Sequence, residues 1–380
     1  MAEAGVLRPV WAEVDLAAIR ENVREIAALV APARVLAVVK ADAYGHGADA
    51  VARAVIEAGA QWLGVALVEE GVRLREAGIE APILLLSEPA PEAAASVVMH
   101  RLTPVVYTEG GVDALAAAAV ATNEGRLLGV HLKVDTGMHR VGVTAAGAVR
   151  LAETIESRSG LRMEGVCTHL AAADDNTDEY TNDQLERFDA VIADLSESGR
   201  RPELVHAANT AGALAFPRAR YDMVRVGIGV YGIAPAHDLE GVVTLRPAMS
   251  VKACVSHVMR LPAGERVSYG LRYELDRESW IATLPIGYAD GVTRALGHTG
   301  GQVLVRGRRF PIAGTVTMDQ LMVDLGDMRV DPGEEVVLLG VQGNDSIPAW
   351  EWAERLETIP YEVVCGIGPR VPRRYTESRR

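Results

Sequence analysis

The segment Ala37-Val38-Val39-Lys40-Ala41-Asp42-Ala43-Tyr44-Gly45-His46-Gly47 gives the first clear indication of the fold. A short apolar run leads directly to Lys40, and a turn rich in glycine and polar residues follows. This order is typical of a buried β-strand that ends in a functional loop. In a barrel, a lysine at the carboxyl end of a strand points toward the mouth where barrel enzymes place their active sites. A partly desolvated lysine can form a Schiff base with an aldehyde; a lysine that only reaches solvent from the strand end is the alternative.

Similar apolar runs recur along roughly the first 230 residues, and segments with helical spacing separate them. About eight strands that alternate with helices over this length have the size of a closed (β/α)8 barrel, with a doubly wound open sheet as the alternative. The predicted strands are Val35–Val39, Trp62–Ala66, Pro82–Leu86, Leu102–Val106, Leu128–Val134, Met163–Cys167, Leu204–Ala207 and Met223–Val226.

The pattern changes after about residue 240, where short runs with β character are separated by Gly, Pro and Asp turns. Only Pro348–Ile359 is predicted to be a helix in this region. We therefore predict an α/β protein, with a (β/α)8 barrel over residues 1–240 and a mostly β domain over residues 241–380. The strands predicted in the second domain are Val251–Val258, Arg266–Tyr269, Trp280–Leu284, Gln302–Val305 and Glu335–Leu339.

Composition narrows the class of partner. The chain has 380 residues and a net charge of −13, which argues against nucleic acid or an anionic membrane as the main partner. The three cysteines, Cys167, Cys254 and Cys365, are widely spaced and suggest neither a disulfide framework nor a metal site. The first residues lack a basic segment followed by an apolar run, so we expect a cytoplasmic protein.

The segment Arg225-Val226-Gly227-Ile228-Gly229-Val230-Tyr231-Gly232 contains the pattern G-x-G-x-x-G. A dinucleotide site is not favoured, because the pattern lies at the end of the alternating region and the twentieth residue after its last glycine is Lys252, not an acid. Barrels often bind phosphate at the loops after their last two strands. The segment beginning Asn209-Thr210 follows the preceding strand and could add a hydroxyl group. Glycines that only make tight turns are the alternative.

Two further groups of residues are candidates for a binding site. In Lys133-Val134-Asp135-Thr136-Gly137-Met138-His139-Arg140, the guanidinium group of Arg140 could hold a carboxylate, although a surface salt bridge is the simpler explanation. His169 follows another strand, where a histidine with purely structural hydrogen bonds is common. In the β domain, tyrosines occur in Gly-flanked turns, within Ser268-Tyr269-Gly270 and Pro285-Ile286-Gly287-Tyr288-Ala289-Asp290-Gly291. Such tyrosines usually pack and form one hydrogen bond.

Together these segments resemble the alanine racemase family, in the same order and over essentially the whole chain. The match rests on AVVKADAYGHG, HLKVDTGMHRVG, THLAAAD, NTA, DMVRVGIGVYG, VSYG, PIGYADG, GTVTMDQ and RVPRRY. The first string is the most specific, because relatives of the fold that bind the same cofactor do not carry it. The segments of the second domain matter as much, because small cofactor-binding barrels lack that domain.

The resemblance implies a role for each matching residue. Lys40 would hold pyridoxal 5'-phosphate as an internal aldimine and act as the base for D-alanine. Tyr269 would be the opposing base for L-alanine and reach into the active site of the partner subunit in a homodimer. The remaining implied roles are phosphate binding by Tyr44, Thr210, Gly227 and Ile228; contact with the pyridine nitrogen by Arg225, with His169 behind it; substrate-carboxylate binding by Arg140 and the backbone at Met318; a carbamylated lysine at Lys133 that braces Arg140; and lining of the substrate entrance by Tyr288 and Arg294.

One departure from the family stands near the carboxyl end. Some members carry a tyrosine just before the RVPR segment that also contacts the phosphate, and here Gly368-Pro369 precedes it. Tyr375 is not an obvious replacement.

The predicted reaction is the interconversion of L-alanine and D-alanine, which in bacteria supplies D-alanine for the cell wall. Removal of a proton from one face of the α-carbon and its return to the other requires a base on each side. A racemase of serine or of broader specificity would use the same residues, and a non-catalytic pyridoxal-phosphate protein would need neither Tyr269 nor the second domain. A basic-amino-acid decarboxylase would place a carboxylate where Arg225 stands.

Overall fold

The computed structural model describes residues 7–122, 125–175, 177 and 179–377. The chain forms two compact units. One comprises residues 19–43 and 48–246, and the other comprises residues 1–18, 44–47 and 247–380. We call the first the barrel unit and the second the β unit. Among the described residues, no helix combines the length and the apolar character needed to cross a lipid bilayer.

The barrel unit contains eight parallel strands in the order β10-β2-β3-β4-β5-β6-β8-β9, which close almost completely into a barrel. Most of their residues are buried, as expected when helices cover the outside and side chains fill the inside. The barrel prediction is therefore confirmed, and the open sheet is excluded. The strands are β2 (Arg34–Val38), β3 (Trp62–Val65), β4 (Ile83–Leu85), β5 (Thr103–Val106), β6 (Leu128–Asp135), β8 (Leu161–Cys167), β9 (Leu204–His206) and β10 (Met223–Val226).

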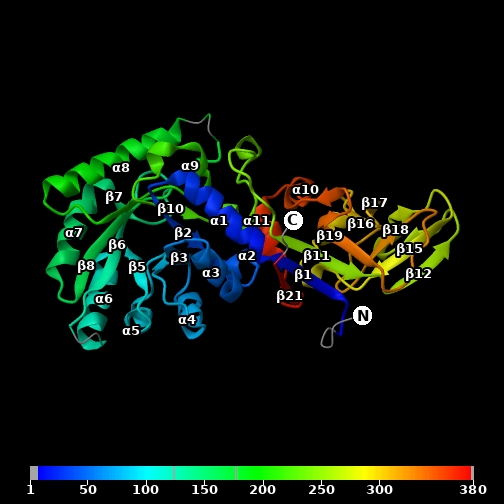
Figure 1. Ribbon diagram of the computed structural model, residues 1–380, viewed down its shortest axis with the longest axis horizontal. Coiled ribbons are helices and arrows are strands. Elements are labelled where there is room, and N and C mark those ends of the chain that lie inside the picture. The colour runs from blue at the N-terminus through cyan, green and yellow to red at the C-terminus, as the bar shows by residue number, and fades with distance from the viewer. Residues whose placement is uncertain (1–6, 123–124, 176, 178, 378–380) are drawn as a thin grey trace. The chain divides into compact units, whose positions relative to one another are not determined.

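Helices connect these strands and lie outside them in Figure 1. Helix α8 (Tyr180–Glu197) shows the expected helical spacing, because its buried residues include Leu185, Phe188 and Leu195. A short strand, β7 (Val143–Thr144), pairs with β6 beside the barrel. The helices are α1 (Leu16–Val30), α3 (Ala48–Glu57), α4 (Val68–Glu76), α5 (Ala94–Met99), α6 (Glu109–Thr122), α7 (Ala148–Ser157), α8 (Tyr180–Glu197) and α9 (Thr210–Ala215).

The β unit is built on a sheet in the order β17-β16-β19-β11-β1-β21, with β20 added beside β19. A second sheet has the order β12-β15-β18, and β13 and β14 form a separate ribbon. The unit therefore has the mostly β character predicted for it. Its strands are β1 (Val10–Asp15), β11 (Met249–Cys254), β12 (His257–Leu261), β13 (Arg266–Val267), β14 (Tyr273–Glu274), β15 (Ser279–Leu284), β16 (Gln302–Val305), β17 (Arg308–Pro311), β18 (Leu321–Asp324), β19 (Glu335–Gln342), β20 (Asp345–Ile347) and β21 (Arg373–Thr376).

The predicted division assigns residues 1–240 to the barrel, but the first strand, β1, pairs elsewhere. β1 lies between β11, to which it is antiparallel, and β21, to which it is parallel. It therefore belongs to the sheet of the β unit and not to the barrel. This pairing is favoured because it buries three apolar side chains completely, those of Val10, Ala12 and Val14.

The predicted strand Val251–Val258 is two strands in two sheets. Val255 N–H donates to the carbonyl of Glu334, next to β19, whereas Ser256 N–H donates to the carbonyl of Thr283 in β15. The chain therefore changes sheets between these two residues. The sequence does not reveal such a change, because no glycine or proline interrupts the run.

Two further local predictions were wrong. The run Arg266–Tyr269 is a strand only through Val267, because Ser268 has a φ of 67° and a 3₁₀ turn (Tyr269–Leu271) begins after it. The helix predicted over Pro348–Ile359 ends earlier, as α10 (Ala349–Arg355), and a further helix, α11 (Pro360–Gly366), follows. Pro360 is the first residue of α11 and forces Ile359 into an extended conformation, which separates the two helices.

Candidate active site

Lys40 lies two residues after the end of β2 and begins a turn of unusual hand. Ala41, Asp42, Ala43 and Tyr44 have φ angles of 52°, 53°, 55° and 53°, and the first three have ψ angles between 47° and 52°. These values define one turn of left-handed helix, labelled α2 (Lys40–Tyr44). Each L-residue in this conformation costs about 1–2 kcal/mol. The sequence indicated a turn here, but not its hand, because none of these four residues is glycine.

Arg225 lies on β10, the strand next to β2 in the barrel. Its side chain is almost completely buried. One amino group, Nη2, donates to the carbonyls of Thr168 and Ala207 at 2.8 Å each and to Nδ1 of His169 at 3.1 Å. Several groups of the barrel thus fix the guanidinium group. The expected proximity of Arg225 and His169 is observed.

A chain of two histidines extends from Arg225 into the barrel. Nη1 of Arg225 lies 2.8 Å from Nδ1 of His206, and Nε2 of His206 lies 2.8 Å from Nδ1 of His131. Arginine can only donate, so Nδ1 of His206 accepts and its Nε2–H donates to His131. His131 then carries its proton on Nε2, which has no hydrogen-bond partner among the described residues.

These histidines are held in the neutral form. Burial lowers the pKa of His131 to about 3, and the positive charges of Arg162 and Arg225 act in the same direction. The pKa values of His169 and His206 are also well below the usual range, first because of burial and then because of Arg225. Two uncharged imidazoles can therefore accept hydrogen bonds from Arg225. The arrangement keeps the positive charge on the guanidinium group.

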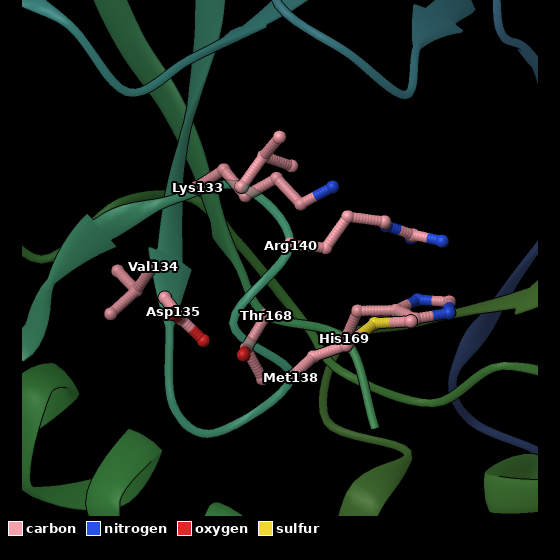
Figure 2. A pocket seen from close by; sticks show the side chains of 8 residues that line it. Lys133, Val134, Asp135, Met138, Arg140, Thr168 and His169 are labelled. Atoms are coloured by element: carbon pink, nitrogen blue, oxygen red, sulfur yellow. The ribbon is translucent and has the colours of Figure 1, made fainter. Parts of the chain in front are cut away.

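Lys133 and Arg140 line one small cavity together with His169. Figure 2 shows the side chains of Lys133 and Arg140 extending in the same direction, with the ring of His169 below them. Lys133 is buried, and its Nζ lies 3.2 Å from the carbonyl of Leu86. Burial lowers the pKa of Lys133, and the nearby charges of Arg225, Arg140 and Lys40 lower it further. The uncharged amine form of Lys133 is therefore favoured relative to that of a free lysine.

Arg140 forms no ion pair or hydrogen bond with any described residue, so the alternative of a surface salt bridge does not hold there. The exposed guanidinium group, with buried Lys133 nearby, is available to a carboxylate ligand.

The loops after the last two strands are joined. Gly227 N–H, just after β10, donates to the hydroxyl of Thr210 at 2.9 Å, and Thr210 begins α9 after β9. Thr210 and Ile228 are both buried. The three residues predicted to bind phosphate in the barrel unit, Thr210, Gly227 and Ile228, therefore lie together.

Tyr44, the fourth residue predicted to bind phosphate, belongs to the β unit. Its ring lies beside that of Tyr361 on α11, with 6.0 Å between the ring centroids. The hydroxyl of Tyr375 packs against Gly47, where a Cβ would lie 1.9 Å from it. Tyr361 was not selected from the sequence, because it follows a helix break and belongs to no recognisable pattern. Its position next to Tyr44 makes it the candidate for the tyrosine missing before the RVPR segment.

The other predicted residues, Tyr269, Tyr288, Arg294 and Met318, all lie in the β unit. Tyr269 is 72% exposed, so its phenol is available to a surface outside its own unit. The turn of Tyr288 and the loop of Met318 are joined: Tyr288 N–H donates to the carbonyl of Thr317, and Ala289 N–H to that of Met318. Gly287 permits this approach, because a Cβ there would lie 2.2 Å from the oxygen of Thr317.

A buried ion pair holds the same turn. Asp290 is completely buried, and Arg8 donates to its two carboxylate oxygens at 2.8 and 2.9 Å. Asp290 also accepts from Gly287 N–H at 3.0 Å, and Arg370 lies 3.4 Å away. The amino-terminal segment and the carboxyl-terminal segment thus fix the turn that carries Tyr288.

The chain resembles known proteins over nearly its whole length. The family model for the alanine racemase N-terminal domain matches residues 14–235, and that for the alanine racemase C-terminal domain matches residues 248–375. The chain belongs to the alanine racemase family. Among curated family members, it is 50% identical to alanine racemase of Symbiobacterium thermophilum, with 97% of each chain covered. It is 43% identical to alanine racemase 1 of Bacillus subtilis, with 98% of this chain and 94% of that protein covered.

Solved structures of family members superpose closely. Alanine racemase of Streptomyces lavendulae gives a TM-score of 0.91 at 38% identity, with 98% of each chain covered. A histidine racemase of Leuconostoc mesenteroides gives 0.89 at 30% identity, with 97% of this chain and 98% of that chain covered. The architecture is thus shared by racemases named for different amino acids.

The residues present fit a pyridoxal phosphate group. The Nε–H of Arg225 has no partner among the described residues, although the rest of its guanidinium group is well bonded. It can donate to an unprotonated ring nitrogen. Lys40 would supply the amine for the aldehyde, and Thr210 and Gly227 lie after β9 and β10, the last two strands of the barrel, where barrels bind phosphate.

Proposed function

We propose that this protein is a pyridoxal-phosphate-dependent alanine racemase that works as a cytoplasmic homodimer and supplies D-alanine for cell-wall synthesis. The observation that carries the proposal is that Lys40 follows β2 and Arg225 lies on the adjacent strand β10, with Arg225 bonded only to neutral partners. The full-length family match supports the choice of reaction.

In this proposal, Lys40 anchors the cofactor and Thr210, Gly227, Ile228 and Tyr44 hold its phosphate. Tyr361 is a further phosphate ligand, because its ring lies beside that of Tyr44. The cofactor, when bound, withdraws electrons from the α-carbon of the substrate. Arg225 would face the ring nitrogen; because arginine stays charged and accepts no hydrogen bond, that nitrogen would stay unprotonated and the withdrawal would be weaker than beside a carboxylate.

The substrate is positioned by its carboxylate. Arg140 and the backbone at Met318 bind it, and Lys133, as a carbamate, braces Arg140. The pKa of Lys133, lowered by burial, supports this role because only the neutral amine reacts with carbon dioxide. Lys40 exchanges the α-proton of D-alanine and Tyr269 that of L-alanine, from opposite faces.

The second base comes from the other subunit of the dimer. Tyr269 is exposed on the β unit. A residue that completes the active site of a partner subunit must be exposed when its own chain is considered alone. Tyr288 and Arg294 line the entrance that this dimer forms. A non-catalytic cofactor carrier would need none of these residues.

A racemase of broader specificity is the second candidate, and the similarity to a histidine racemase favours keeping it. Discrimination between side chains that differ by one methylene contributes only about 1–3 kcal/mol, and changes in a few pocket residues can supply that. Rates with alanine, serine and histidine decide between the two.

The test is incubation of the purified protein with pyridoxal phosphate and L-alanine in deuterated water. We expect D-alanine to rise to equal amounts with deuterium at the α-carbon. Lys40→Ala and Tyr269→Phe should each abolish racemisation, whereas Tyr273→Phe, a nearby tyrosine bonded to Asp324, should not. Retention of full activity by Lys40→Ala would refute the proposal.

Mixing the two inactive variants tests the shared active site. Random exchange of subunits gives mixed dimers in which one site has both residues, so activity should return to about one quarter of the wild-type value. No recovery, with subunit exchange shown by mass spectrometry, would place Tyr269 and Lys40 in the same chain's site.

A further inference from the structure

The left-handed turn after Lys40 needs an explanation beyond its sequence. Ala41, Asp42, Ala43 and Tyr44 are all non-glycine residues with positive φ. In this conformation the Cβ of an L-residue crowds a following carbonyl oxygen. Such a run persists only where surrounding groups over-determine it, and the groups that do so control where Lys40 points.

Glu70, in the first turn of α4, provides one such contact. Its Oε1 accepts from Ala41 N–H at 2.6 Å. Its Oε2 accepts from Ala66 N–H at 2.8 Å and from Leu67 N–H at 3.1 Å. One carboxylate thus joins the turn after β2 to the loop after β3, and both of its oxygens accept hydrogen bonds.

Other contacts act on the later part of the turn. Asp42 accepts from Ala48 N–H at 2.9 Å and so caps α3. Arg73, one turn beyond Glu70 on α4, lies 3.6 Å from Asp42, but both side chains are substantially exposed and such pairs contribute little. The bond from Glu70 therefore remains the strong contact at Ala41, the residue directly after Lys40.

We propose that Glu70 is a positioning residue for Lys40. The inference rests on the proposed function only for what Lys40 does; the carboxylate acts on the backbone and touches neither substrate nor cofactor. It must be a carboxylate, because both of its oxygens accept from backbone N–H groups. A glutamine would turn an N–H₂ group toward one of these donors and lose that side of the bridge.

Glu70→Gln and Glu70→Ala test the proposal against a matched control. Glu88 makes a comparable set of bonds after the next strand, accepting from Tyr107 N–H, Thr108 N–H and the Thr108 hydroxyl. It has no bond to the Lys40 turn, so Glu88→Gln reports the loss of a capping carboxylate alone. The full-length proteins are compared with and without pyridoxal phosphate.

Two measurements separate the turn from the reaction. Hydrogen–deuterium exchange of peptides covering residues 39–47 in the cofactor-free protein reports whether the turn opens. Titration with pyridoxal phosphate, followed by borohydride reduction and mass spectrometry, reports the affinity of its covalent attachment to Lys40. For Glu70→Gln we expect faster exchange and an affinity reduced about tenfold, the factor that corresponds to one charge-assisted hydrogen bond of about 1.4 kcal/mol.

A second substitution should restore what Glu70→Gln removes. Ala41 is exposed, and glycine adopts positive φ without the steric cost, so Ala41→Gly relieves strain and leaves no cavity. Added to Glu70→Gln, it should return the affinity to within about threefold of wild type. A role of Glu70 only in capping α4 would not respond to Ala41→Gly.

The outcomes are distinct. Unchanged exchange and affinity in Glu70→Gln, or an equal loss in Glu88→Gln, would overturn the inference. Failure of the wild-type protein to take pyridoxal phosphate on Lys40 would instead overturn the proposed function, and the exchange data would still decide whether Glu70 holds the turn.

Discussion

The buried histidine His131 makes the protein sensitive to mild acid. In the folded protein its pKa is about 3, whereas an unfolded histidine titrates near 6.5. Between these values the unfolded chain binds one more proton than the folded chain, so the free energy of unfolding falls as the pH is lowered. The loss begins near pH 6.5 and continues toward pH 3.

The magnitude follows from the size of the shift. Each pH unit below about 6.5 removes about 1.4 kcal/mol per neutral buried histidine, so the change from about pH 7.5 to pH 5 removes about 2 kcal/mol through His131. His131→Asn eliminates this titration and leaves an oxygen that can accept from Nε2–H of His206. Burial and Arg225, the two largest causes of the low pKa values of His206 and His169, are the same in both proteins, so most of their contribution cancels in the comparison.

The assay is urea unfolding at the two pH values, at one protein concentration, for wild type, His131→Asn and the exposed-site control His257→Asn. The substitution itself lowers stability at both pH values, because it shortens a buried side chain. We expect the pH-dependent loss in His131→Asn to be about 2 kcal/mol smaller than in wild type. An equal loss in the two proteins would refute the reasoning that His131 is neutral and desolvated.

Three further predictions concern the site. Arg225→Glu should increase transamination, measured as pyruvate formed per racemisation event, because a carboxylate would keep the ring nitrogen protonated; an unchanged ratio would contradict the role given to Arg225. Lys133 should carry a carbamate, visible by carbon-13 NMR with labelled bicarbonate and absent in Lys133→Ala, which should raise the KM for alanine more than it lowers kcat. Asp290→Asn should lower the free energy of unfolding by about 3–5 kcal/mol, because it leaves Arg8 without its buried partner; a loss below about 1 kcal/mol, measured by urea unfolding, would show that the pair is effectively solvated.

Much of the barrel could be predicted because its strands are buried on both faces. Most of them read as largely apolar runs, and Lys40 and Arg225 stand out beside such runs. His131 and His206 lie in equally apolar strands, but a single buried histidine gives no signal that distinguishes a bonded network from a core residue. Their connection appears only when β6, β9 and β10 are brought together in space.

Pairing over long distances in the sequence escaped prediction for a related reason. β1 has the alternation of an ordinary strand, and nothing in it specifies a partner near residue 250 instead of the adjacent barrel. The left-handed turn at Ala41 was equally hidden, because local propensity favours the right-handed form for every residue in it. In both cases tertiary contacts, such as that of Glu70, decide the conformation.

The position of β1 between β11 and β21 has a consequence for biosynthesis. The strand leaves the ribosome before the barrel, but its partner β11 begins roughly 230 residues later, which at about 5–20 residues per second means a delay of about 10 to 50 seconds. During that interval the barrel can fold as an insertion, its two ends joined by reciprocal hydrogen bonds between Asn22 and Arg246. Until β11 is made, the nascent chain carries β1 as an unpaired apolar strand ahead of the barrel. An unpaired strand is a site for chaperone binding and for wrong pairing with other nascent chains on the same messenger RNA.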